Sequence, residues 1–339
     1  MLAYPLVKHG QSRVLKLREV ETPTTGQGEV RVKISHIGIN YAEILSRRGQ
    51  YAWAPDKPYV PGMEALGTIE EVGPGVKREI GERVIVGAQY GAYAEKIVVP
   101  AYLAFPTLPH LTDTEQAAFL VNYMTAWVAL IKQARLMLDD TVLITAAAGG
   151  VGTAAVQLAH AFGCKVFGTA SKAYKLDLLR DLKVEAAINY QDQDWDNHLK
   201  EINGNQGVDV VLELVGGDTF TKSKDLLNPF GRLVIAGVAS IKWTKTNPLS
   251  WISALQKIPR YDLRKMAVSS NGILATHIGY LIKNESLTSQ LWKELSSFCI
   301  THQIKPLVSH EFDFDELPRA HDYIESRKSY GKVVVKVGS

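Results

Sequence analysis

The stretch Val142–Phe162 constrains the fold of this chain more than any other, and it reads VLITAAAGGVGTAAVQLAHAF. It opens with an apolar run typical of a buried strand and closes with apolar residues at helical spacing. Between the two lies a loop of small residues, Ala147-Ala148-Gly149-Gly150-Val151-Gly152. A strand that turns through glycines into a helix occurs at nucleotide sites, and also as an ordinary buried turn.

The glycines of this loop fit the pattern G-x-G-x-x-G except at its first position, which is Ala147. Gly149 would let the backbone approach a pyrophosphate, and Gly152 would let the helix lie close to the strand. The free N–H groups and the positive dipole at the start of the helix would favour the same anion. The loop is therefore a candidate dinucleotide site.

Strands and helices alternate regularly from this point on. Five strands are expected, at Thr141–Ala147, Lys165–Ala170, Ala186–Asn189, Val208–Leu214 and Arg232–Gly237. Helical patterns lie between them at 152–162, 173–182, 194–203 and 218–227, and a sixth strand is expected within Gly272–Ile278. Such strand–helix units predict an α/β fold with a doubly wound parallel sheet, that is, a Rossmann nucleotide-binding domain.

A different pattern occupies the first third of the chain, up to about Pro109. Short alternating segments separated by Gly and Pro turns are expected as strands at Glu29–Ile34, Gly67–Val72, Arg83–Val86 and Tyr93–Val99. They predict a compact, mostly antiparallel domain, a partly closed β-barrel. The capping box Thr112-Asp113-Thr114-Glu115 then begins a helical region that extends to Lys132.

The C-terminal part is expected to pack back onto the β domain. Its elements are an amphipathic helix with Leu287, Leu291, Leu295 and Phe298 on one stripe, a strand near Leu307–Phe312, a helix at Asp315–Ser326 and a strand at Lys332–Val337. A length of 339 residues suits two domains. We expect residues 1–121 with 291–339 to form the β-barrel domain, and residues 122–290 to form the nucleotide-binding domain.

Charge and cysteine content exclude several classes of protein. A net charge of +3 is too small to indicate a nucleic-acid partner. Thr141–Ala159 carries no formal charge, but its glycines, glutamine and threonines argue against a membrane span. Cys164 and Cys299 cannot make a disulfide framework and fit a reducing compartment. Because Met1–Gly10 lacks a signal-peptide pattern, we expect a cytoplasmic protein.

The end of the second expected strand indicates which dinucleotide would bind. An NAD site has an acidic residue about twenty residues past the glycine loop, where it binds the ribose 2′-OH. Here that place reads Thr169-Ala170-Ser171-Lys172-Ala173-Tyr174-Lys175. A hydroxyl and two cations suit a 2′-phosphate and hence NADPH. The alternative is that Lys172 and Lys175 are ordinary surface residues at a helix start. Cations at that place oppose the helix dipole, which counts against this alternative.

The residues favour neither a metal nor a covalent nucleophile. Catalytic zinc takes three protein ligands, and both cysteines fall outside the expected cleft, so only His36 and Glu64 remain. No Ser or Cys nucleophile motif is visible. Asn40 on pattern alone suits an ordinary turn, Tyr51 a loop anchor, and Glu64 a hydrogen-bonding brace. The candidate polar groups are Asn40, Tyr41, Glu43, Tyr51, Glu64, Tyr93 and Thr125.

The segment Lys242–Lys265 holds six cations against Asp262 alone, with Trp243, Trp251 and Tyr261 between them. Basic and aromatic residues together can bind an acidic membrane surface or nucleic acid. We favour the alternative of a solvated loop and helix whose tryptophans lie in the core or near a substrate site.

Several stretches together resemble the zinc-free quinone oxidoreductase family of the medium-chain dehydrogenase/reductase superfamily, over nearly the whole chain. They are Gly38-Ile39-Asn40-Tyr41, Gly49-Gln50-Tyr51, Pro61-Gly62-Met63-Glu64, Ala146–Gly152, Ile188-Asn189-Tyr190, Gly216-Gly217-Asp218-Thr219 and Tyr330-Gly331-Lys332-Val333-Val334. Others resemble the branch that includes the vesicle amine transport protein: Leu120-Val121-Asn122-Tyr123, Asn228-Pro229-Phe230-Gly231, His277-Ile278-Gly279-Tyr280-Leu281 and Ile304-Lys305-Pro306. Zinc-dependent relatives have a histidine where Met63 stands, which agrees with the absence of a metal.

The resemblance implies a GroES-like β domain, a Rossmann domain and NADPH. It implies that Asn40, Tyr51 and Thr125 border the nicotinamide and substrate. Further cofactor contacts that it implies are Gly149, Gly150, Val151 and Gly152 at the pyrophosphate, Ser171, Lys175 and Tyr190 at the adenosine phosphate, Val215 and Gly237 on the nicotinamide side, and Lys332 from the C-terminal segment. Lys172 is our addition, from its charge and position.

The expected activity is NADPH-dependent, zinc-independent reduction of quinones or activated alkenes such as α,β-unsaturated carbonyls. Asn40 and Tyr51 would orient the acceptor and hydrogen-bond its developing oxyanion. The alternative is an NADPH-binding adaptor with little turnover, which binds a membrane or protein partner through Lys242–Lys265; membrane association itself is not favoured. An edge strand near 272–278 would join two subunits into a homodimer, unless a helix or loop covers it.

Overall fold

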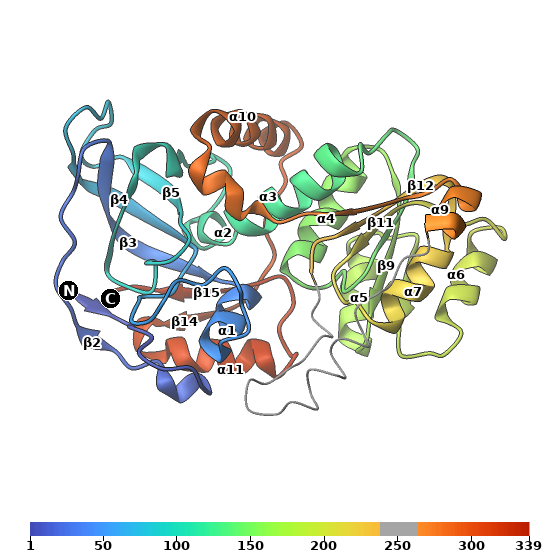
Figure 1. Ribbon diagram of the computed structural model, residues 1–339, viewed down its shortest axis with the longest axis horizontal. Helices are drawn as coiled ribbons and strands as arrows, with labels where there is room; N and C mark the ends of the chain where they lie inside the picture. Colours follow the sequence, from blue (N-terminus) through green and yellow to red (C-terminus); the bar gives the residue numbers. More distant parts are fainter. Residues whose placement is uncertain (238–262, 339) are drawn as a thin grey trace. The chain divides into compact units, whose positions relative to one another are not determined.

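The structure is a computed structural model, and it describes residues 1–237 and 263–338 (Figure 1). The chain divides into two compact units, Met1–Met124 with Gly279–Ser339, and Thr125–Ile278. The basic segment Lys242–Lys265 lies almost wholly outside the described residues, so its two interpretations stay open. The seven-stranded sheet of one unit and the six-stranded sheet of the other carry the candidate site residues.

The first unit is built around a sheet of order β14-β15-β3-β4-β5-β7, with β6 paired to β3. Its strands are β3 (Glu29–Ile39), β4 (Glu64–Val72), β5 (Arg83–Gly87), β6 (Lys96–Pro100), β7 (Ala104–Pro106), β14 (Val308–Asp313) and β15 (Lys332–Lys336). All pairs are antiparallel except β14 with β15. Because β14 and β7 end the order without pairing, the barrel is partly closed, which confirms the expected GroES-like domain.

Smaller elements surround this sheet. They are β1 (Leu2–Ala3) paired with β2 (Arg18–Glu19), α1 (Tyr41–Arg48), α2 (Asp113–Ala117), α10 (Glu285–Thr301) and α11 (Leu317–Glu325), and the 3₁₀ turns Ser12–Val14, Ala101–Leu103, Ile278–Lys283 and Phe314–Glu316. The C-terminal part returns to the β domain as expected, since β15 pairs directly with β3.

Several expected boundaries in this region are wrong, and one of them is the start of β4, which lies at Glu64 rather than Gly67. β3 continues five residues past Ile34, because residues 36–38 pair with both β4 and β15 and Ile39 pairs with β15. β6 begins at Lys96 rather than Tyr93, since Ala94 makes only a single bridge, to Ala3. The helical region ending at Lys132 divides into α2, α3 (Leu120–Trp127) and a π-helical stretch, Val128–Gln133.

The long β3 depends on one glycine. At Gly38 an added Cβ would lie 2.2 Å from the Ala117 carbonyl oxygen and 2.9 Å from the Glu64 side chain, so a larger residue would push α2 away from the strand. The register beyond Gly38 carries the chain directly to Asn40 at the start of α1.

The second unit is a parallel six-stranded sheet of order β10-β9-β8-β11-β12-β13. The strands are β8 (Thr141–Ile144), β9 (Lys165–Ala170), β10 (Ala186–Asn189), β11 (Val208–Glu213), β12 (Leu227–Ile235) and β13 (Gly272–Ala275). The helices are α4 (Gly150–Ala161), α5 (Ala173–Asp181), α6 (Trp195–Ile202), α7 (Asp218–Asp225) and α9 (Leu263–Ser269). The strand order reverses between β8 and β11, which confirms a doubly wound Rossmann domain with its sixth strand at one edge.

The second boundary between the units falls at residue 279 rather than 291. Residues 279–290 belong with the β domain, where the Tyr102 hydroxyl donates to the Ile282 carbonyl. A hydrogen bond between residues so far apart in the chain is not visible in helical periodicity, which explains the difference.

Candidate functional site

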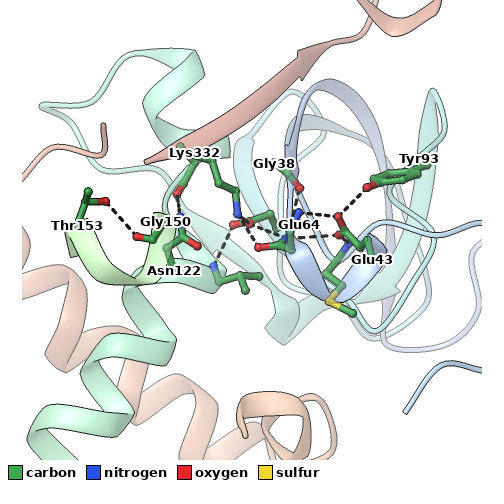
Figure 2. A network of polar contacts seen from close by, with 12 residues as sticks. Gly38, Glu43, Glu64, Tyr93, Asn122, Gly150, Thr153 and Lys332 are labelled. Atoms are coloured by element: carbon green, nitrogen blue, oxygen red, sulfur yellow. Dashed lines mark hydrogen bonds and ion pairs between the residues drawn. The ribbon is translucent and has the colours of Figure 1, made fainter. Parts of the chain in front are cut away.

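The end of β3 brings buried polar side chains together inside the first unit (Figure 2). Asn40 follows β3 directly and caps α1 in extended backbone conformation. Lys332 begins β15, which pairs with the last residues of β3, and Glu64 begins β4 opposite Gly38. The register of three strands therefore places Asn40, Glu64 and Lys332 side by side.

Lys332 and Glu64 form a buried ion pair, with side chains 2% and 0% exposed. Lys332 Nζ also donates to Asn40 Oδ1 at 2.6 Å. The other Glu64 oxygen accepts the Val121 N–H at 2.9 Å. Pairing and hydrogen bonding offset the desolvation of both charges, and Glu64 acts as a brace between β4, β15 and the start of α3.

The Asn40 amide is engaged on both sides. Its Nδ2 lies 3.0 Å from Glu64 Oε1, 3.3 Å from Glu43 Oε1 and 3.4 Å from the Gly38 carbonyl. Its oxygen accepts from Lys332. Asn40 is therefore more than an ordinary turn residue, because it links two carboxylates and an ammonium.

Glu43, in the first turn of α1, is 1% exposed, and its carboxylate accepts four hydrogen bonds. The donors are the N–H groups of Asn40 and Met63 at 2.7 Å, the Tyr93 hydroxyl at 2.6 Å and Asn40 Nδ2 at 3.3 Å. Burial raises the pKa of Glu43, and these hydrogen bonds oppose that rise. The Tyr93 hydroxyl also lies 2.9 Å from Nε2 of His321 on α11.

Tyr51 lies in the loop after α1, partly buried. Burial, with a smaller contribution from the Glu43 charge, raises its pKa to about 12, so its phenol is protonated at neutral pH and can donate a hydrogen bond. Thr125 lies in α3, as the first residue of the second unit.

In the second unit, the glycine loop has the geometry that a dinucleotide phosphate needs. Gly149 caps α4 and its N–H donates to Ala146 O, while Ala146 adopts a φ of 47°. A Cβ at Gly152 would lie 2.5 Å from Ala146 O and 2.7 Å from Ala147, so only glycine lets α4 start this close to β8. The first turn of α4 thus presents free backbone N–H groups beside a bare backbone, as a pyrophosphate site requires.

The four residues expected at the adenosine phosphate lie at the ends of two neighbouring strands. Ser171 follows β9, Lys172 caps α5, and Lys175 lies in its first turn, which contains no acidic residue. The Tyr190 N–H donates to the Ala170 carbonyl at 3.2 Å, which brings Tyr190 beside Ser171. A hydroxyl, two cations and a helix N-terminus fit a phosphate group.

Val215 and Gly237 follow two adjacent strands, β11 and β12. A Cβ on Gly237 would lie 3.1 Å from Leu214 O, so the two segments touch. Glu213, the last residue of β11, is fully buried, and its Oε1 accepts the N–H groups of Val215 and Gly216, both at 2.7 Å. This carboxylate therefore shapes the turn in which Val215 lies.

Glu213 and His321 were not among the candidates from sequence, although each carried a signal. Glu213 is a carboxylate at the end of a mostly apolar strand, just before Gly216-Gly217. His321 falls on the buried stripe of α11 with Leu317 and Ala320. Neither signal identifies a partner, because the partners come from tertiary contacts.

Both units match models of known protein families. Residues 26–110 match the model of the alcohol dehydrogenase GroES-like domain, and residues 150–259 match that of the zinc-binding dehydrogenase. The human synaptic vesicle membrane protein VAT-1 homolog is 32% identical over 96% of this chain and 83% of its own length. A probable quinone oxidoreductase of Leishmania amazonensis is 33% identical over 92% of this chain and 89% of its own.

Among solved structures, Escherichia coli quinone oxidoreductase complexed with NADPH superposes with a TM-score of 0.87 at 28% identity, covering 99% of this chain and 100% of that one. The fold and these relatives define an oxidoreductase of the medium-chain dehydrogenase/reductase class. The chain belongs to the quinone oxidoreductase family of that superfamily, in the branch that contains the VAT-1 homologues.

Proposed function

We propose that this protein binds NADPH and reduces quinones or activated alkenes without zinc. The observation that carries the proposal is the group formed by Ser171, Lys172, Lys175 and Tyr190, where an NAD site would have an acidic residue. The printed names of the Leishmania relative and of the E. coli structure, a quinone oxidoreductase with NADPH, support it.

In this proposal, Gly149–Gly152 hold the pyrophosphate, and Val215 and Gly237 lie along the nicotinamide. Lys332 contacts the cofactor from β15, while Asn40 and Thr125 border the substrate. A reduced nicotinamide supplies a hydride when it is bound. The protein's own part is to orient the acceptor, to exclude water and to stabilise negative charge on the acceptor oxygen.

Tyr51 is the candidate donor to that oxygen. Its phenol is protonated at neutral pH and can donate a hydrogen bond. The Asn40 amide hydrogen-bonds to Glu64 and Glu43 through its nitrogen and to Lys332 through its oxygen. We therefore assign the oxyanion contact to Tyr51, and to Asn40 the positioning of Lys332. The proton that completes the reduction comes from water.

The donor set supports zinc independence. Within the parts of the chain that the structure describes, no three His, Cys, Asp or Glu side chains come together as a metal site. Met63 donates its backbone N–H to Glu43 and offers only a thioether to a metal.

A second candidate, a binding protein with little turnover, is favoured by the printed name of the VAT-1 relative, which calls it a synaptic vesicle membrane protein. No helix within residues 1–237 and 263–338 is long and apolar enough to cross a membrane. We propose a cytoplasmic homodimer, joined through β13 at the edge of the second sheet.

The test is steady-state oxidation of NADPH with phenanthrenequinone, on protein treated with a chelator. We expect turnover, and Tyr51→Phe should lower kcat/KM roughly 100-fold, as loss of an oxyanion donor does, with the NADPH dissociation constant unchanged. Tyr90→Phe, at an exposed loop tyrosine, is the matched control. NADPH binding without turnover would favour the second candidate, and turnover that depends on added zinc would refute the proposal.

A further inference from the structure

A line of buried hydrogen bonds crosses the β domain from α11 to β15. It runs from His321 to Tyr93, from Tyr93 to Glu43, and from Glu43 to Asn40, which reaches Lys332 and Glu64. Every one of these side chains is less than 9% exposed. Figure 2 labels Tyr93, Glu43, Glu64 and Lys332 among them. Tyr93 and His321 lie at the far end of the line from Lys332.

The line is suited to holding groups in place and not to moving protons. Between Glu43 and Lys332 the connection passes through the Asn40 amide, which hydrogen-bonds without passing a proton on. Three of the four donors to Glu43 are N–H groups that cannot become acceptors. Only the Tyr93 hydroxyl can either donate to Glu43 or accept from it.

The charge on Glu43 therefore determines how well Asn40 is held. As a carboxylate it accepts from both the backbone and the side chain of Asn40. As a neutral acid it would lose one acceptor site and would have to donate to the Tyr93 oxygen. Because the single Tyr93 hydroxyl hydrogen is donated to Glu43, the contact with His321 requires the tautomer that carries hydrogen on Nε2. In that tautomer His321 donates to the Tyr93 oxygen and keeps the Tyr93 hydrogen directed at Glu43.

We propose that Tyr93 and His321 are positioning residues that keep Glu43 ionised, and that Glu43 through Asn40 holds Lys332 in its working position. The inference rests on the proposed function, in which Asn40 and Lys332 border the substrate and cofactor. Tyr93, His321 and Glu43 do not touch the reacting atoms.

The surrounding groups are consistent with this role. Burial raises the pKa of Glu43, and the Tyr93 hydrogen bond is the largest effect opposing it, ahead of the Asn40 N–H, the Lys332 charge and the Met63 N–H. Other groups near this line are Tyr51, Tyr59 and Arg47. Burial and the Arg47 charge lower the pKa of His321 to about 3, so His321 is neutral and acts by its hydrogen bond.

The first experiment is the pH profile of kcat/KM for Tyr93→Phe with NADPH and phenanthrenequinone. Without the hydroxyl, Glu43 should protonate at higher pH, so the acidic limb should move up by about one unit or more and activity should recover in alkaline buffer. Tyr4→Phe is the matched control, since Tyr4 is equally buried in the same unit and its hydroxyl donates only to Phe314 O. Its profile should match that of the native protein.

Substitutions at His321 test the second member of the line. His321→Gln keeps an N–H for the Tyr93 oxygen and should retain the native profile, whereas His321→Leu should shift the acidic limb in the same direction as Tyr93→Phe. If Tyr93→Phe fails to fold, the pH profile of kcat/KM for His321→Leu tests the inference in its place. A purely structural role would lower activity equally at every pH in these variants, and that result would overturn the inference.

The titration of Glu43 itself separates this inference from the proposed function. NMR of protein with isotope-labelled glutamate carboxyl carbons, assigned with Glu43→Gln, follows the protonation of Glu43 without any substrate. A rise of its midpoint in Tyr93→Phe but not in Tyr4→Phe supports the inference even if no quinone is reduced. Equal midpoints in the native protein and Tyr93→Phe would refute it even if turnover is fast.

Discussion

At the residue scale, we propose that the start of α5 decides which of NADPH and NADH the protein prefers. Lys172 and Lys175 occupy the N-terminal turn of a helix, where cations oppose the dipole and where the first turn contains no acidic residue. A dianionic phosphate bound among them would offset the local cost of placing cations there. The same phosphate would account for a hydroxyl at Ser171 and for the position of Tyr190 beside it.

We predict that the native protein binds NADPH at least about tenfold more tightly than NADH, because charge-assisted contacts to a phosphate are strong. Lys172→Ala combined with Lys175→Ala should shrink this ratio towards one, chiefly by weakening NADPH. Fluorescence titration with both cofactors measures it, with Lys293→Ala on the exposed face of α10 as the control. Equal dissociation constants in the native protein would contradict the prediction.

At the scale of elements, the ends of β8 and β11 meet where the strand order reverses. Thr145 Oγ1 accepts the Leu214 N–H at 2.8 Å, and Glu213 holds the next two N–H groups through a single oxygen. The turn then continues through Gly216 and Gly217, with φ of 81° and 62°. Ligands of open α/β sheets bind beyond this reversal, so we propose that the turn forms part of the cofactor site.

Substitution of Glu213 should therefore separate its geometry from its charge. Glu213→Leu leaves two buried N–H groups without an acceptor and should weaken NADPH binding about tenfold or more. Glu213→Gln keeps an acceptor oxygen at the same place and should bind nearly as well as the native protein. Thermal unfolding checks that both variants fold, and equal NADPH affinity in the two would show that this turn is not set by Glu213.

The parallel strands were predictable because strands buried on both faces read as continuous apolar runs, as in Val142–Ile144. The end of β3 could not be predicted, because its last residues pair with β15, almost three hundred positions away. In addition, Ser35, His36 and Gly38 break the alternation of apolar and polar residues that marks a strand. The glycine loop and the lysines of α5 were visible locally. The contacts of Glu43, Tyr93 and His321 were not, because they join separate elements.

At the scale of the whole molecule, β13 ends the parallel sheet. It pairs with β12 on one side, and Thr276 N–H donates to Ile235 O in that direction. Because N–H groups alternate along a strand, the Ala275 N–H points to the opposite side, where a second copy could pair. Two-fold symmetry would then join two six-stranded sheets into one.

Light scattering at micromolar concentration should accordingly give about twice the chain mass of 37.4 kDa. Ala275→Pro removes one outward N–H and should favour monomers. Ala186→Pro is the matched control at the other edge, since the neighbouring Glu185 N–H donates inward to Val166 and the Ala186 N–H points away. A native mass near that of one chain would refute the dimer.

The central claim is that this fold carries out a hydride transfer and does not merely hold a cofactor. The most direct measurement uses NADPH deuterated at nicotinamide C4, an α,β-unsaturated ketone and chelator-treated protein, with the product analysed by mass spectrometry. We predict one deuterium on the carbon β to the carbonyl of the saturated product. Tight NADPH binding with no labelled product, from the enone or from a quinone assayed in parallel, would contradict the account.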